Sequence, residues 1–203
     1  MLIRKSAEDR KGEIIAVALR LADELGPDRL TTNAVARAVG LTQPAIFRHF
    51  ASKQALWLAV AEHISETLAL AWQMALHPQD TPLQRIEALI AAQFHQIAQT
   101  PALPAILFSR ELNIENAPLR QVFQTRLAEF QALLAAELSQ ACDAGAIGAD
   151  LAPDDGAVLL TSLVQGLAIK WSLGARGFVL QDEGARLLKV QLAQFAPKPE
   201  GAN

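Results

Sequence analysis

The chain has 203 residues, of which 51% are hydrophobic and 19% charged, and its formal net charge is −3 at pH 7. This composition is typical of a globular protein with an apolar core, and it excludes a disordered or collagen-like chain. The single cysteine excludes an internal disulfide framework. Without a recognisable signal peptide or long apolar run, the sequence predicts a cytoplasmic protein with no membrane partner.

Apolar residues recur with helical spacing along the chain, and almost nothing alternates with the period of two that is typical of strands. The pattern therefore predicts an all-α fold of about nine helices. These helices cover 14–25, 31–40, 42–50, 52–76, 81–100, 104–108, 118–145, 153–173 and 179–195. Thr31, Ser52 and Thr81 are candidate N-caps, and Gly26 and Gly40 are candidate helix ends.

Charge is unevenly distributed between the two parts of the chain. Over 1–53 there are nine Lys and Arg against six Asp and Glu, whereas over 54–203 nine face fifteen. A basic N-terminal part on an acidic remainder is typical of a small nucleic-acid-contacting module joined to a body with another role. Offsets of this size also occur in ordinary domains, so the charge balance alone decides little.

Two short helices flank Gly40-Leu41-Thr42, which is the spacing of a helix-turn-helix. The second helix begins with small or polar residues, and a recognition helix inserts that end into the major groove of DNA. Thr42, Gln43 and Ala45 are therefore candidate base contacts, since Gln can bind adenine through two hydrogen bonds and an Ala methyl can contact thymine. The alternative is an ordinary helical corner that does not bind DNA.

Cationic and polar side chains around this corner are candidate phosphate contacts, above all Arg37, Arg48, His49 and Lys53. The full set of predicted DNA-binding residues is Thr31, Thr32, Asn33, Arg37, Thr42, Gln43, Pro44, Ala45, Phe47, Arg48, His49 and Lys53. Taken singly, Arg48 and His49 would also be ordinary solvated surface residues.

The segment that runs from Leu30-Thr31-Thr32 through Val39-Gly40-Leu41-Thr42 to Lys53 resembles the DNA-binding segment of the TetR family of bacterial transcription regulators. The likeness covers about a quarter of the chain. One departure is Phe47, because the family usually has a Tyr there whose hydroxyl reaches a phosphate. The resemblance implies a homodimer that binds a double-stranded DNA operator and responds to a small molecule.

On this basis we expect a three-helix DNA-binding domain at 1–53, a larger helical bundle for effector binding and dimerisation at 54–196, and a disordered tail at 197–203. No nucleophile–base pair, phosphate-binding glycine loop or paired metal-ligand motif is present. The sequence therefore predicts no enzyme activity, no cofactor and no metal site.

Polar and aromatic residues of the body are candidates for an effector pocket. They are His63, Phe94, His95, Phe108, Arg110, Phe123 and Trp171. For His63 and His95 the alternative is a hydrogen-bonded histidine in the core, and for Arg110 a solvated surface. With few charges among them, these residues favour a small apolar or aromatic effector.

The last two predicted helices carry apolar residues over most of their circumference, and such helices must be covered on all sides. This pattern predicts a two-fold interface between subunits. The candidate interface residues are Leu160, Val164, Leu167, Trp171, Leu188 and Leu192. The alternative is that both helices are buried within one chain.

Together these features predict a small-molecule-responsive repressor that acts as a dimer on a near-palindromic operator. The alternative is a DNA-binding regulator without an effector, controlled by a protein partner or by its own abundance. Activation in place of repression also remains open, because the sign of regulation depends on where the operator lies relative to the promoter.

Overall fold

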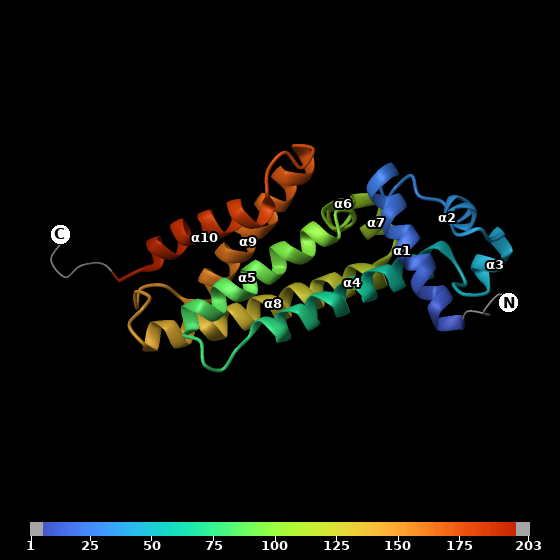
Figure 1. The fold of residues 1–203 in the computed structure, drawn as a ribbon. Helices are drawn as coiled ribbons and strands as arrows, with labels where there is room; N and C mark the ends of the chain where they lie inside the picture. The colour runs from blue at the N-terminus through green and yellow to red at the C-terminus, as the bar shows by residue number, and fades with distance from the viewer. Residues whose placement is uncertain (1–5, 198–203) are drawn as a thin grey trace. The chain divides into compact units, whose positions relative to one another are not determined.

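The structure is a computed structural model that describes residues 6–197. Within that range it contains ten helices and no strand, which confirms the predicted all-α fold with an N-terminal helix-turn-helix and a helical C-terminal part (Figure 1). The helices are α1 (Ala7–Leu25), α2 (Thr32–Val39), α3 (Gln43–Phe47), α4 (Lys53–Ala75), α5 (Pro82–Gln99), α6 (Leu103–Phe108), α7 (Arg110–Glu115), α8 (Ala117–Asp143), α9 (Pro153–Leu173) and α10 (Leu180–Phe195).

The helices form two compact units. The first contains 6–66 together with 100–124, and the second contains 67–99 together with 125–197. The division falls inside α4 and α8, so each of these helices contributes to both units. The predicted functional division at residue 53 remains a prediction, and most of the predicted tail at 197–203 lies outside the described residues.

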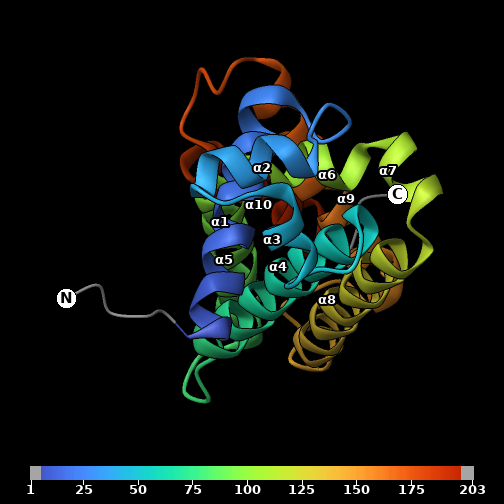
Figure 2. The ribbon, with the colours of Figure 1, turned by 90° about the vertical axis from the view of Figure 1, so that its right-hand side faces the viewer.

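In the first unit, α1 packs against α2, and α2 against α3 (Figure 2). The Ser6 hydroxyl accepts a hydrogen bond from the Asp9 amide, and the Asp9 carboxylate accepts one from the Ser6 amide, which fixes the start of α1. The helix ends at Gly26, whose positive φ of 85° suits glycine. The face of α1 that includes Ile14 and Ala18 is fully buried.

The helix-turn-helix forms as the sequence predicts. The Thr31 hydroxyl accepts a hydrogen bond from the Ala34 amide at 3.1 Å, and Gly40 ends α2 in the left-handed region with φ of 74°. The regular part of α3 is shorter than predicted and ends at Phe47. One further turn follows, since the Phe50 amide still donates to the Ile46 carbonyl at 2.9 Å.

The helix α7 was not predicted, and it belongs to the first unit. The Ser109 hydroxyl caps it by accepting a hydrogen bond from the Leu112 amide at 3.0 Å. The same hydroxyl donates to the Asp28 carboxylate at 2.5 Å, which ties the start of α7 to the loop between α1 and α2. The buried Asn116 side chain donates to the Gln54 carbonyl at 3.0 Å and so ties the end of α7 to α4.

In the second unit, α10 packs on both α5 and α9. A glycine is required at position 184, because a Cβ there would lie 2.4 Å from the ring of Phe94 on α5. The Trp72 ring of α4 stacks on Phe130 of α8 with 4.6 Å between centroids. The Trp72 indole N–H donates to Gln93 of α5 at 2.9 Å, so these aromatic residues connect three helices.

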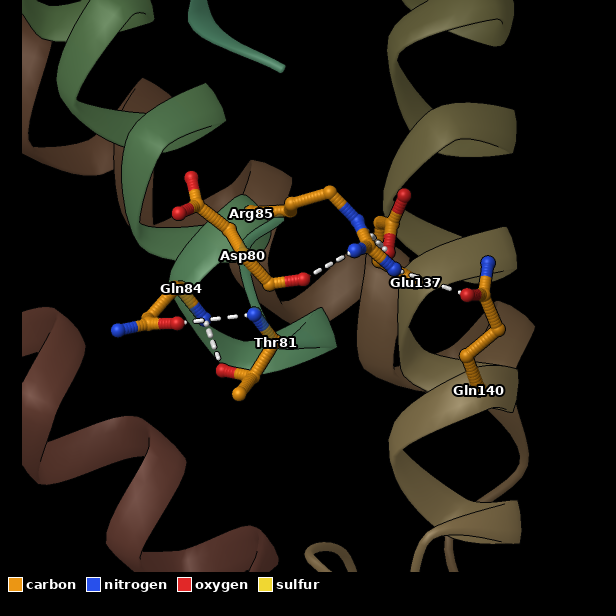
Figure 3. Close-up of polar contacts among 6 residues, drawn as sticks. All are labelled: Asp80, Thr81, Gln84, Arg85, Glu137 and Gln140. Carbon is orange, nitrogen blue, oxygen red and sulfur yellow. Dashed lines mark hydrogen bonds and ion pairs between the residues drawn. The ribbon is translucent and has the colours of Figure 1, made fainter. Parts of the chain in front are cut away.

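A largely buried cluster around Arg85 connects the start of α5 with α8 (Figure 3). The Arg85 Nε atom lies 2.7 Å from Glu137 Oε2, and its Nη2 atom donates to Gln140 at 2.8 Å. The third contact is a hydrogen bond from Arg85 Nη1 to the Asp80 carbonyl. Because Arg85 uses every side of its guanidinium, the cluster holds the loop before α5 against α8.

Two of the predicted N-caps precede long helices, and both are confirmed. The Ser52 hydroxyl accepts a hydrogen bond from the Ala55 amide at 3.0 Å. The Thr81 hydroxyl accepts from the Gln84 amide at 3.3 Å, and the Gln84 side chain accepts from the Thr81 amide at 2.8 Å (Figure 3). This reciprocal arrangement is a capping box.

One described helix, α9, is long and apolar enough to cross a membrane. The sequence did not predict this, because its charge-free stretch is short. In its most apolar window 44% of the residues are buried within the chain, and core helices of globular proteins meet the same criterion. The helix is therefore weak evidence for a membrane span.

Candidate nucleic-acid interface

Most of the predicted DNA-binding residues lie on the surface of the first unit. Exposed side chains belong to Thr31, Asn33, Arg37, Thr42, Gln43, Pro44, Phe47 and Arg48. His49 and Lys53 are half-buried, and Thr32 and Ala45 are buried. Ala45 therefore packs in the core beside Ile46 and is not placed to contact thymine, which corrects the prediction made for its methyl group.

The predicted DNA-binding surface is positively charged, and three of its cations have no ion-pair partner among the described residues. From residue 29 to residue 53 the chain has four Lys and Arg residues and no Asp or Glu. Within residues 6–197, no side-chain ion pair or hydrogen bond involves Arg37, Arg48 or Lys53. By contrast, Arg20 on α1 is paired with Glu24 at 2.9 Å. Cations without an ion-pair partner are available for phosphate contacts.

The exposed side of α3 offers three chemically different groups. Thr42 occupies the N-cap position, but its side chain makes no capping hydrogen bond, so the hydroxyl is free to contact DNA. Gln43 follows with an exposed amide. The Phe47 ring is 42% exposed, which is unusual for a large apolar side chain and suits contact with sugars or thymine methyl groups.

One polar contact across the corner was not predicted. The Gln43 Nε2 atom on α3 donates to the Thr32 hydroxyl on α2 at 2.9 Å. Thr32 was predicted to contact DNA, yet it is only 7% exposed. The sequence gives no sign of this contact, because the two residues are separated by a turn.

Two family models match the chain. Residues 14–60 match bacterial regulatory proteins of the tetR family. Residues 82–196, more than half of the chain, match the C-terminal domain of BetI-type transcriptional repressors. The chain belongs to the TetR family of transcription regulators. It is a DNA-binding regulator with a helix-turn-helix, as the sequence predicted.

Individual relatives of this TetR-family regulator are distant. The nucleoid occlusion factor SlmA of Haemophilus influenzae is 27% identical over 128 residues, which are 63% of this chain and 57% of SlmA. The chain thus spans less than two thirds of that relative. A putative TetR-family regulator from Rhodococcus has the same fold, with a TM-score of 0.78, 19% identity, and coverage of 92% of this chain and 98% of that one.

A third similar protein has a structure with a bound ligand. This is FadR from Bacillus subtilis in complex with stearoyl-CoA, with a TM-score of 0.75 and 17% identity. The comparison covers 90% of this chain and 97% of FadR. At this level of identity the likeness shows a shared fold only.

The predicted effector residues are divided between the two units of the regulator. His63, Phe108, Arg110 and Phe123 belong to the first unit, and Phe94, His95 and Trp171 belong to the second. His63, His95, Phe108 and Arg110 are exposed, so neither histidine is a core residue. Phe94, Phe123 and Trp171 are buried. The pocket itself remains a prediction.

The predicted dimer residues turn out to lie inside a single chain. Leu160, Val164, Leu167, Trp171 and Leu188 are buried, and Leu192 is half-buried. The five buried side chains are covered within the single chain, as the alternative reading of these helices expected, and the dimer interface itself remains a prediction. The large apolar residues that α9 leaves exposed are Val158, Leu159, Ile169 and Leu173. On α10 the corresponding residue is Val190, which is 52% exposed.

One further group stands out, and the sequence analysis missed it. The Trp57 side chain on α4 is 1% exposed, and its indole N–H has no hydrogen-bond acceptor among the described residues. The other two tryptophans both have acceptors, Gln93 for Trp72 and the Phe178 carbonyl for Trp171. A buried indole N–H without a partner is uncommon, because tryptophan usually hydrogen-bonds when buried.

Proposed function

We propose that the chain is a cytoplasmic repressor that binds a near-palindromic operator as a homodimer and releases it when a small apolar or aromatic effector binds. The match to BetI-type repressors over the C-terminal part supports repression. The stearoyl-CoA complex of FadR, a protein of the same fold, supports an effector with a long apolar part.

The dimer is supported by the exposed apolar face of α9, formed by Val158, Leu159, Ile169 and Leu173. Gly166 lies among these residues along the helix, and a Cβ there would meet no atom within 4 Å. A glycine in the middle of a helix is unfavourable, and it is useful where another backbone approaches closely. A two-fold dimer through this face would carry two recognition helices, one from each subunit.

The observation that carries the effector proposal is the Trp57 indole. Burying the indole N–H without an acceptor destabilises the protein, because the hydrogen bond to water is lost and not replaced. A carbonyl or carboxylate of a bound ligand would supply the missing acceptor. Other residues of this part of α4, among them Val60 and Ala61, are also buried and apolar. We therefore narrow the effector to a largely apolar molecule that carries a hydrogen-bond acceptor for the Trp57 indole.

The Ser109–Asp28 and Asn116–Gln54 hydrogen bonds offer a route from the effector to the DNA-binding surface. They tie segment 100–124 to the loop before α2 and to the start of α4. An effector that prefers a different position of α7 would therefore also displace these contacts. It shifts the equilibrium only by its difference in affinity for the two arrangements.

The test is a binding screen with stearoyl-CoA, free fatty acids and aromatic carboxylates, read as a rise in melting temperature and loss of operator binding. For a compound that binds, Trp57→Phe should weaken effector binding about tenfold, through the loss of one hydrogen bond, and leave operator affinity unchanged. The matched control is Trp72→Phe, since the Trp72 indole already has an acceptor. Equal effects of the two changes would contradict the role of Trp57.

The alternative is a regulator controlled by a protein partner or by abundance, without an effector. The similarity to SlmA, a nucleoid occlusion factor, favours this alternative. If no compound in the screen changes the melting temperature or operator affinity, the effector proposal fails and this alternative replaces it.

A further inference from the structure

The hydrogen bond between Thr32 and Gln43 joins the two helices of the helix-turn-helix through their side chains. Its donor is Gln43 Nε2, its acceptor is Thr32 Oγ1, and the distance is 2.9 Å. Thr32 is buried, whereas Gln43 is exposed at the start of α3. The Thr32 hydroxyl therefore holds one end of an otherwise solvent-facing amide.

In the structure this contact engages the Nε2 end of the amide, with the Thr32 hydroxyl as acceptor. A glutamine amide has two N–H donors on one side and a carbonyl acceptor on the other, and a free amide exposes either end by rotation. With Nε2 held by Thr32, one N–H is used, and Gln43 Oε1 together with the second N–H remains for a base. The amide then offers one acceptor and one donor side by side.

Adenine and guanine differ in the hydrogen-bonding groups that they present in the major groove. In the major groove adenine presents the N7 acceptor beside the N6 amino donor, which matches an amide with one acceptor and one donor. Guanine presents two acceptors, N7 and O6, and pairs best with two donors. An amide fixed as in this structure therefore suits adenine, whereas a freely rotating one would also accept guanine.

We propose that Thr32 is a positioning residue that does not bind DNA itself but orients the Gln43 amide to select adenine over guanine at one operator position. This inference rests on the proposed DNA-binding surface. A direct phosphate contact by Thr32 is disfavoured because its side chain is 7% exposed and its hydroxyl is already engaged. Its neighbours Thr31 and Asn33 are exposed and remain available for the backbone.

The experiment selects bound sites from a random DNA pool with the full-length wild-type protein and with Thr32→Val, Thr32→Ser and Gln43→Ala. Affinities are then measured for operators that differ only at the position to which Gln43→Ala assigns the contact. Thr32→Val keeps the shape of the side chain and removes the hydroxyl, so it should lower the preference for adenine over guanine about tenfold. Thr32→Ser should retain the preference, because it keeps the hydroxyl.

Two controls separate orientation from folding. Thr161→Val removes another buried hydroxyl, one that donates to the Ala157 carbonyl at 2.7 Å on α9, and should leave base preference unchanged. In the Gln43→Ala background, Thr32→Val should have no further effect on base preference, since the amide that it orients is gone. The melting temperature of each variant shows whether folding is affected.

The outcomes distinguish this inference from the proposed function. Equal weakening of all operators by Thr32→Val would mean that Thr32 contacts the backbone, and an unchanged base preference would mean that the hydrogen bond is irrelevant to recognition. Either result overturns the inference and leaves a DNA-binding regulator. If the wild-type protein enriches no sequence at all, the proposed operator binding fails first.

Discussion

Single residues of the recognition surface divide by chemistry into two kinds of DNA contact. Arg37, Arg48 and Lys53 carry charges without partners in the described chain and suit phosphates, which every sequence shares. Gln43 carries a neutral amide held by Thr32 and suits a base edge. Affinity and selectivity are thus expected to reside in different side chains.

Lys53→Ala tests the first kind of contact. Loss of this cation should weaken binding to all operator sequences alike and reduce the slope of log affinity against log salt concentration by about 1. The measurement is a salt titration of binding to a selected operator and to an unrelated duplex. A loss confined to the selected operator would show that Lys53 contacts a base.

At this scale the sequence predicts residue types better than their orientation. The cations around the corner were found because charge is visible in a sequence, and Arg37, Arg48 and Lys53 have no ion-pair partner among the described residues. Ala45 was misplaced because α3 has little more than one regular turn, too short for apolar spacing to show which side is buried. The Thr32–Gln43 bond depends on how two helices meet, which no local pattern contains.

The ends of several helices are set by capping residues that can be recognised in the sequence. Thr31, Ser52 and Thr81 each form the predicted cap, and Gly26 and Gly40 each adopt a positive φ. The helix α7 was missed because it has six residues and follows α6 directly. Its cap, Ser109, also forms a contact with Asp28 that lies far away in sequence.

The Arg85 cluster allows a test at the element scale. Arg85→Met should lower the free energy of unfolding by about 2–4 kcal/mol, because it leaves Glu137 mostly buried without its partner. Urea unfolding followed by circular dichroism measures the loss. If stability is unchanged, the cluster does not hold α5 against α8.

The control for that test is the exposed pair of Arg186 and Glu183 on α10. The Arg186 Nε atom lies 2.8 Å from Glu183 Oε2, and this hydrogen bond lowers the pKa of the Glu183 carboxyl. Both groups are in contact with solvent, however, so Arg186→Met should leave the free energy of unfolding almost unchanged.

The whole molecule is expected to function as two copies joined through the exposed face of α9. Leu159→Asp should convert the dimer into a monomer, because residue 159 is 46% exposed in the single chain and a charge there harms only an apolar interface. Sedimentation velocity at micromolar concentration measures the change. Operator affinity should fall with it, since two half-sites would no longer be bound together.

Met74→Asp is the matched control, because Met74 is 70% exposed and lies on α4. It should leave the sedimentation coefficient unchanged. Loss of the dimer through Met74→Asp, or its persistence in Leu159→Asp, would place the interface elsewhere.

At the scale of the whole chain, the sequence identified α9 and α10 as unusually apolar, but it selected the buried face of α9 as the interface. A helix that is apolar on nearly all sides carries no signal for which side meets its own chain and which meets a second copy. Leu160 and Val164 turned out to face the core, whereas Val158 and Leu159 do not. Only the packed structure separates these two sides.

The first unit is discontinuous, since it consists of 6–66 together with 100–124. A chimaeric regulator joined after residue 66 would therefore transfer the helix-turn-helix without the returning segment. The acceptor body would have to supply replacements for the buried Ile106, Leu112 and Asn116, or the transplanted recognition surface would lack part of its own support. Exchange of DNA specificity between regulators of this shape is thus better achieved by substitutions within α2 and α3 than by cutting and joining chains.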